Sequence, residues 1–168
     1  MQVVSEAFEA RLPYPEIKAE RKNPKYAGEM LSNIGGSASE ISAVSLYVYN
    51  SLILWQDKEA AAAFHKISIV EMHHLEIFAT LARMLGAEPR LWAPRGNRMQ
   101  YWSPVYNKYF IEREKAIKNA VEEERRTIEK YTRQARRITD AFVVENIERI
   151  IMDEQVHVEI LNGLLRGY

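Results

Sequence analysis

Two Glu-x-x-His motifs constrain this chain more than any other feature of its sequence. The first is Glu71-Met72-His73-His74 and the second is Glu154-Gln155-Val156-His157. In each motif a carboxylate and an imidazole stand three residues apart, which places both side chains on the same face of a helix. Both motifs fall inside long segments whose apolar residues recur at helical spacing. Two such pairs on facing helices predict a four-helix bundle with metal ligands in its core.

The remaining helices follow from apolar periodicity and from capping signals. We expect helices over residues 24–55, 57–85, 111–138 and 140–166, the first of them interrupted by Gly35-Gly36. Prolines and aromatic residues fill 87–109, which predicts a long crossover between the second and third helices. Its aromatic residues either pack over the bundle or a neighbouring subunit, or form a substrate gate.

The predicted fold is therefore all-α, a four-helix bundle of two helical hairpins joined by a long crossover. The bundle domain should occupy residues 24–168. Residues 1–23 carry Pro13 and Pro15 and show no helical periodicity, so they predict an N-terminal arm. We interpret this arm as a surface strap, with exchange between subunits as the alternative.

Each remaining helix offers a matching carboxylate. Glu40 is a charged residue on the apolar seam of the first helix, a position that is costly unless the charge is paired or bound to a metal. The third helix contains three consecutive glutamates, and periodicity selects Glu124. Glu123 is the alternative, since a local bend would rotate the face.

The two hairpins form an internal repeat. The distance from Glu40 to Glu71 is 31 positions, and from Glu124 to Glu154 it is 30. A tyrosine follows each first glutamate by seven positions, as Tyr47 and Tyr131. This repeat also favours Glu124 over Glu123.

The six candidate ligands place four carboxylates and two imidazoles in one layer of the core: Glu40, Glu71, His74, Glu124, Glu154 and His157. Without countercharge such a layer is unstable, and two divalent ions would balance it. Oxygen and nitrogen donors without thiolate suit iron or manganese, although zinc can occupy such sites in crystals. Asp153 is a candidate partner for the free ring N–H of a liganding histidine. Tyr47 and Tyr131 are candidate proton or radical relays, or they simply pack.

Composition excludes several other classes of protein. Lys and Arg total 23 and Asp and Glu total 23, so the net charge of zero argues against a nucleic-acid partner. The chain has no cysteine, hence no disulfide framework and no rubredoxin-like iron centre. We expect no signal peptide and no membrane span, and therefore a cytoplasmic protein.

The ligand pattern resembles that of the ferritin-like superfamily of dinuclear-metal carboxylate proteins. The segment from Gly35 to Ala43 is similar to the first ligand helix of manganese catalases, and the segment 67–76 resembles small rubrerythrin- or bacterioferritin-like proteins. The chain departs from rubrerythrins at Thr127, where an extra carboxylate would stand. It departs from manganese catalases at Glu123, which stands where an arginine is expected.

The resemblance implies an oxidoreductase that acts on hydrogen peroxide or dioxygen, either catalase-like or peroxidase-like. The alternatives are a ferroxidase or iron-storage protein, and an assembly protein whose metals only stabilise the bundle. The implied partners are a small-molecule oxidant and further copies of the chain in a homo-oligomer.

Overall fold

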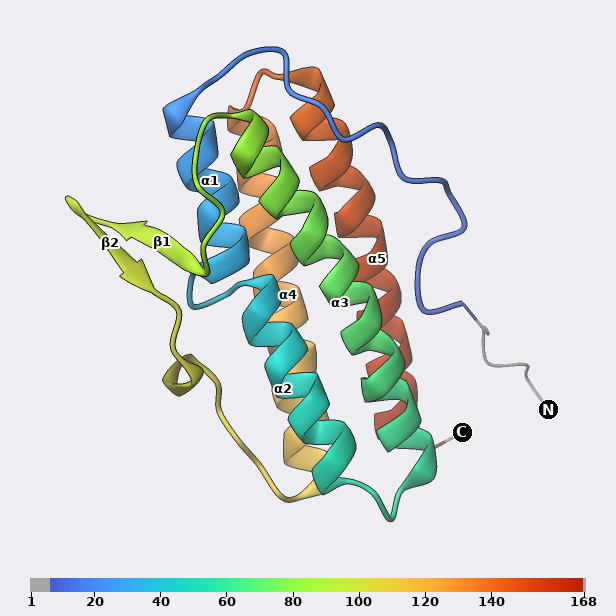
Figure 1. Cartoon of the computed structure of the whole chain (residues 1–168). Coiled ribbons are helices and arrows are strands. Elements are labelled where there is room, and N and C mark those ends of the chain that lie inside the picture. The colour runs from blue at the N-terminus through green and yellow to red at the C-terminus, as the bar shows by residue number, and fades with distance from the viewer. Residues whose placement is uncertain (1–6, 168) are drawn as a thin grey trace.

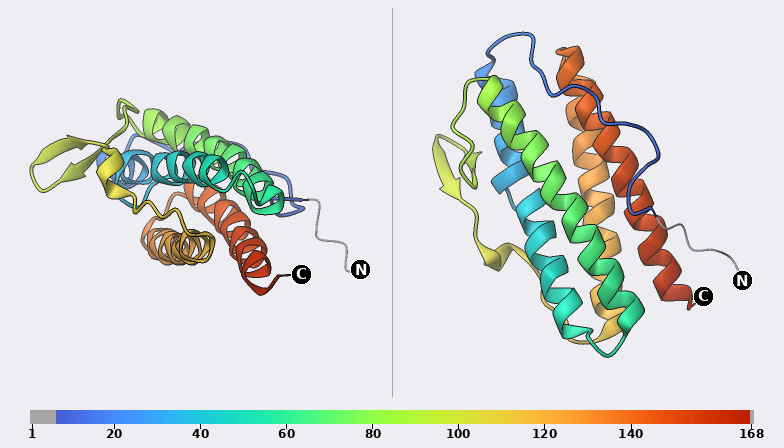
Figure 2. Two further views of the ribbon diagram at one scale, coloured as in Figure 1. Left: turned by 90° about the horizontal axis from the view of Figure 1, so that it is seen from below. Right: turned by 45° about the vertical axis from the view of Figure 1, so that its right-hand side comes forward.

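The helices stand side by side as a bundle in the computed structural model, which describes residues 7–167 (Figure 1). The helices are α1 (Pro24–Gly35), α2 (Glu40–Ile53), α3 (Lys58–Met84), α4 (Arg113–Arg137) and α5 (Ala141–Arg166). α1 and α2 follow one another along α3 and share the first of the four bundle positions (Figure 2). α4 and α5 form the second hairpin. The predicted all-α bundle of two hairpins with a long crossover is confirmed.

The predicted interruption at Gly35-Gly36 is confirmed, but it is a complete break over 36–39, so the expected helix over residues 24–55 is two helices, α1 and α2. Gly36 and Ser39 both adopt extended backbone conformations. Two adjacent glycines carry a high entropic cost in a helix, and Ser39 favours a helix start. The break places Glu40 in the first turn of α2, where the helix dipole favours a negative charge.

The other helix starts follow their capping residues. The Asn23 side chain accepts hydrogen bonds from the amides of Lys25 and Tyr26, both at 3.1 Å. Asp57 accepts the Ala60 amide at 3.0 Å at the start of α3. These side chains satisfy amides that have no partner within the helix, which is why helices begin there.

The crossover contains a hairpin that the sequence analysis did not predict. Strand β1 (Trp92–Arg95) pairs antiparallel with β2 (Arg98–Tyr101), and a short 3-10 helix, η1 (Pro104–Tyr106), follows. The crossover is held against α2: Trp102 Nε1 donates to Ser42 Oγ at 2.8 Å, and Asn107 Nδ2 donates to the Ser42 carbonyl at 3.1 Å. Trp102 thus packs along the side of the bundle, whereas Tyr101 and Tyr109 are exposed.

The core consists of two apolar clusters with a polar layer between them. One cluster joins α1 and the later part of α3 to α4 and α5, and includes Met30, Phe78 and Ile147. The other joins α2 and the early part of α3 to α4 and α5, and includes Phe64, Ile117 and Leu161. The polar layer is therefore shielded from bulk water at both ends of the bundle.

The described part of the N-terminal arm, residues 7–23, lies along α5 and then crosses to α1 (Figures 1 and 2). Arg149 donates from Nε to the Leu12 carbonyl and from Nη2 to the Ala10 carbonyl, each at 2.8 Å. Asn146 donates to the Glu16 carbonyl at 3.0 Å. Residues 1–6 of the predicted arm, and Tyr168, lie outside the described residues.

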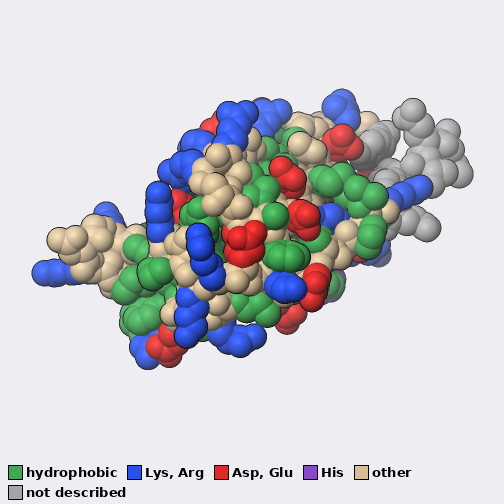
Figure 3. All heavy atoms as spheres, turned by 90° about the horizontal axis from the view of Figure 1, so that it is seen from above, with side chains coloured by type: hydrophobic (Ala, Val, Ile, Leu, Met, Phe, Trp, Pro, Cys, Tyr) green, Lys and Arg blue, Asp and Glu red, His purple; other side chains and the backbone are tan. Residues whose placement is uncertain are grey.

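Acidic and basic side chains are interspersed on the end of the bundle that Figure 3 shows. Within residues 7–167, no helix has both the length and the apolar character needed to cross a lipid bilayer.

Candidate metal centre

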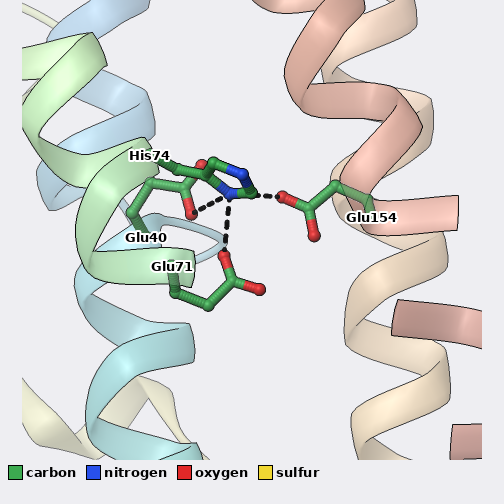
Figure 4. Close-up of side chains that lie close together, drawn as sticks. All are labelled: Glu40, Glu71, His74 and Glu154. Atoms are coloured by element: carbon green, nitrogen blue, oxygen red, sulfur yellow. Dashed lines mark hydrogen bonds and ion pairs between the residues drawn. The ribbon is translucent and has the colours of Figure 1, made fainter. Parts of the chain in front are cut away.

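The bundle brings all six predicted ligands into one buried layer. Glu40 comes from α2, Glu124 from α4, and the two Glu-x-x-His pairs from α3 and α5. Figure 4 shows Glu40, Glu71 and Glu154 directed toward the His74 ring. The helical period directs each of these side chains toward the core. The antiparallel pairing of the helices brings all six to the same level along the bundle axis.

Glu71 and Glu154 connect the two imidazoles. Glu71 lies 3.2 Å from His74 Nδ1 through Oε2 and 2.9 Å from His157 Nδ1 through Oε1. Glu154 lies 3.3 Å from His74 Nδ1 through Oε1 and 3.1 Å from His157 Nδ1 through Oε2. Each carboxylate therefore divides its two oxygens between the two histidines.

Glu40 and Glu124 each lie near one histidine only, and at longer distances than Glu71 and Glu154. Glu40 Oε2 is 3.8 Å from His74 Nδ1, and Glu124 Oε1 is 3.7 Å from His157 Nδ1. Two sets of four ligand atoms result, each with all its atoms within 4.8 Å of one another: Glu40, Glu71, His74 and Glu154, and Glu71, Glu124, Glu154 and His157. Glu71 and Glu154 belong to both sets.

The choice between Glu124 and Glu123 follows from their positions on α4. Glu124 is buried among the other candidate ligands, whereas Glu123 is half-buried and forms an ion pair with Arg126 at 2.9 Å. Periodicity therefore selected the glutamate that the structure buries in the core layer.

The outward ring nitrogens of both histidines also have partners. His74 Nε2 lies 3.0 Å from Asp153 Oδ2, the contact anticipated for Asp153. His157 Nε2 lies 2.9 Å from the backbone carbonyl of Phe8. Because a carbonyl oxygen can only accept, Nε2 of His157 carries its proton and Nδ1 faces the centre.

The two predicted tyrosines bond crosswise to the outer glutamates. Tyr47 of α2 donates to Glu124 Oε1 of α4 at 2.5 Å, and Tyr131 of α4 donates to Glu40 Oε1 of α2. Burial and the neighbouring carboxylates raise the pKa of both phenols well above the usual value. Both hydroxyls therefore remain protonated donors at neutral pH.

Without metal, protons supply the countercharge of this layer. Burial and nearby carboxylates raise the pKa of Glu40 and of Glu124 well above the usual value. Burial opposes the charged form of His157, but Glu71 and Glu154 outweigh it and raise its pKa to about 9. Such a cluster releases protons when cations replace them.

The residues fit two divalent cations. Oxygen Oε1 of Glu71 and Oε1 of Glu154 are buried, and neither accepts a well-oriented hydrogen bond from the described residues. The donor nearest each of these oxygens is a poorly oriented imidazole nitrogen. A buried carboxylate oxygen without a good hydrogen bond is costly, and a metal ion would satisfy it. Four carboxylates and two imidazoles form a donor set that suits manganese or iron.

Sequence reasoning missed the contribution of the arm. Tyr14 donates to Asp153 Oδ2 at 2.5 Å, and the Ala10 amide donates to Asp153 Oδ1 at 2.7 Å. Arg149 Nη1 also bonds Asp153 Oδ1, at 2.5 Å. The one available signal was Arg149, a basic residue four positions before Asp153 on the buried face of its helix.

Comparison with known proteins identifies the family. A family described as manganese containing catalase matches residues 7–94. The chain belongs to the manganese-containing catalase family. This membership favours manganese over iron for the centre. The match covers the arm and the first hairpin, including three of the six predicted ligands, Glu40, Glu71 and His74.

Individual relatives of this chain extend the comparison. A probable manganese catalase from Clostridium acetobutylicum is 33% identical over 70 residues, which is 42% of this chain and 31% of that protein. The aligned segment thus spans about a third of the relative's length. Two crystal structures of KatB, a manganese catalase from Anabaena, match with a TM-score of 0.84 and 18% identity over 96% of this chain and 80% of theirs. They share the fold.

Proposed function

We propose that this chain binds two manganese ions through its six core ligands and disproportionates hydrogen peroxide into water and dioxygen. The observation that carries the proposal is the sharing of Glu71 and Glu154 between two ligand sets. Each of these carboxylates has one oxygen on the side of each histidine, as a bridge between two ions requires. The family, and the names of the relatives, support manganese as the metal and peroxide as the substrate.

A bound manganese pair would supply two one-electron changes, matching the oxidation of one peroxide to dioxygen and the reduction of another to two waters. The balance is two molecules of hydrogen peroxide consumed for one of dioxygen and two of water. This reaction needs no outside reductant, which fits a chain that contains no cysteine.

The chain's own residues orient the ligands and exclude water. Tyr47 holds Glu124 and Tyr131 holds Glu40 by donating to one oxygen of each. In Glu40 this leaves Oε2, the oxygen 3.8 Å from His74 Nδ1, for a cation. In Glu124 the oxygen that accepts from Tyr47, Oε1, is also the one 3.7 Å from His157 Nδ1. The apolar clusters on both sides of the layer exclude bulk water, so the charges at the centre interact strongly.

Peroxide would reach the centre on the side of α2 and α4. A cavity of about 20 Å³ lies there beside Tyr47 and Glu124, and its other walls include Ser39, Ser42 and Thr127. This volume holds about one water-sized molecule. Hydroxyl groups along the walls suit a small hydrogen-bonding substrate. Asn107 also lines the cavity, so the crossover borders the proposed route of peroxide to the centre.

The deciding experiment measures metal content and oxygen release on the same preparation. Protein purified with manganese should contain about two ions per chain and should evolve dioxygen from hydrogen peroxide without a reductant. An iron-loaded sample serves as the comparison. Two irons with peroxide consumption only in the presence of reductant would instead indicate a peroxidase or ferroxidase. Tightly held metal without any turnover would indicate a structural role.

Two further expectations remain predictions. We expect a homo-oligomer, which light scattering of the purified protein would measure. α2 exposes Val48 and Leu52, which lie on one helix face, and Trp55 is exposed just beyond the end of the helix. These apolar side chains support self-association. We also expect a cytoplasmic location and neither a nucleic-acid nor a membrane partner.

A further inference from the structure

The histidines of the centre depend on the arm for their outward hydrogen bonds. His157 Nε2 bonds the Phe8 carbonyl directly at 2.9 Å. His74 Nε2 bonds Asp153, and Asp153 is in turn bonded by Tyr14. Both imidazoles are therefore tied to residues 8–14, about 140 positions or more from Asp153 and His157 in the chain.

Asp153 is saturated by donors, and the arm supplies half of them. Its Oδ1 accepts from the Ala10 amide and from Arg149, while its Oδ2 accepts from Tyr14 and faces His74 Nε2. Asp153 is completely buried. Removal of the arm would leave this carboxylate with Arg149 and His74 alone and would open it to water.

Tyr14 is itself held in a specific pose. The Arg149 guanidinium lies over its ring at 4.1 Å, and the His73 ring meets it edge-on at 4.5 Å. Arg149 also bonds two carbonyls of the arm, those of Ala10 and Leu12. The ring is thus clamped from two sides, and its hydroxyl is aimed at Asp153 Oδ2.

We propose that the arm is a working part of the metal centre: Tyr14 positions His74 through Asp153, the Phe8 carbonyl positions His157, and the docked arm governs how long the centre retains its ions. The inference rests on the proposed dinuclear centre. Hydrogen bonds to the outward nitrogen fix the tautomer and orientation of a liganding histidine, and their loss typically weakens metal binding 10- to 100-fold. Tyr14 is a positioning residue, since it does not touch the ligand atoms.

The test compares Tyr14→Phe with Tyr26→Phe. The first variant removes the hydroxyl that bonds Asp153 but keeps the clamped ring. The second removes a hydroxyl that bonds Thr139, away from the centre. We measure the rate at which manganese-loaded protein releases its metal to excess chelator. We expect release to accelerate about 10-fold in Tyr14→Phe and to stay within about two-fold of the wild type in Tyr26→Phe.

A normally folded Tyr14→Phe protein that releases manganese at the wild-type rate would overturn the inference. A wild-type protein that binds no manganese would instead overturn the proposed function, so the two failures are distinguishable.

A second measurement needs no variant. Coupling between sites is reciprocal, so an arm that retains metal must itself be retained by metal. Hydrogen exchange compares the Ala10 amide, which bonds Asp153, with the Glu20 amide, which bonds Asp140 at the far end of the arm. Manganese loading should slow exchange at Ala10 by a larger factor than at Glu20. Equal slowing at both amides would contradict the proposal.

Discussion

Glu71 and Glu154 face each other across the bundle and divide their oxygens between the same two imidazoles. The arrangement has an approximate twofold relationship, since α3 and α5 contribute the same motif and α2 and α4 contribute one glutamate each. Neither ligand set is complete without both shared carboxylates. The loss of either one should therefore affect two ions rather than one.

The first prediction concerns this sharing. Glu154→Gln removes one negative charge and one bridging oxygen from the centre, so we expect bound manganese to fall from two ions per chain to one or fewer. Elemental analysis after dialysis measures the content. Glu148→Gln is the matched control, because Glu148 is an exposed glutamate on the same helix. Two tightly bound ions in the Glu154 variant would contradict the bridging role.

The second prediction concerns the crosswise tyrosines. Tyr131→Phe keeps the ring that packs 5.1 Å from Phe78 but removes the donor to Glu40. Glu40 then loses its fixed orientation, and we expect manganese affinity to fall about 10-fold. Calorimetric titration of the metal-free protein measures the change. In Tyr109→Phe the lost hydroxyl bonds the Pro104 carbonyl on the surface, so its affinity should match the wild type. Equal affinity in all three proteins would show that Tyr131 only packs.

The third prediction concerns the contact between α1 and the crossover. A Cβ at Gly35 would lie 2.3 Å from the Trp92 backbone nitrogen, which cannot move without shifting β1. Gly35→Ala should therefore lower the free energy of unfolding by about 1–3 kcal/mol.

Gly28→Ala is the control for this contact, because its Cβ would meet only Pro94 Cγ at 3.4 Å. Alanine gains up to about 1 kcal/mol over glycine within a helix, so this variant should be neutral or stabilised. Denaturant unfolding of both variants measures the difference. Equal stability of the two variants would mean that the crossover backbone shifts at little cost to make room for the Cβ at residue 35.

The fourth prediction concerns Lys130, whose Nζ donates to the carbonyls of Ser32 and Ala38 at 2.8 Å each. These bonds join the end of α1 to the start of α2. Burial lowers the pKa of Lys130 from 10.5 to about 8. Below pH 8 the amine is charged in both the folded and unfolded states, and its burial cost is fully present.

Between pH 8 and 10.5 the folded protein loses this proton first, so the unfolded state binds more protons and stability rises with pH. Relative to Lys130→Met, the wild type should gain about 2 kcal/mol over this interval, allowing for the partial exposure of the side chain. Unfolding free energies of both proteins at pH 7.5 and 10 measure the difference. A constant difference would show that the amine titrates as in water.

Helical period explains how much of the centre could be predicted. Glu71 and His74 lie on one face of α3 because they are three residues apart, and the same holds for α5. Glu124 could be chosen over Glu123 because only Glu124 shares the phase of the buried residues of α4. These positions on a helix face depend only on spacing within one helix. They are therefore the same in any arrangement of helices that buries that face.

The full extent of the break after α1, and the hairpin that the sequence analysis did not predict, depend on long-range contacts. The break at residues 36–39 depends on two glycines and also on the close approach of Trp92 to Gly35, which no periodicity reveals. The hairpin in the crossover is formed by strands of only four residues each, and it packs against α1.

The amino-acid sequence by itself determined the four-helix bundle and the six candidate ligands that meet in its core, because helix phase and motif spacing are encoded within single segments. Only the tertiary structure decided what holds the outward faces of the histidines. The Phe8 carbonyl is a backbone atom without a residue-type signal. Tyr14 lies 139 positions from Asp153. Such contacts arise when the arm packs along α5, and packing between distant segments is set by the whole fold.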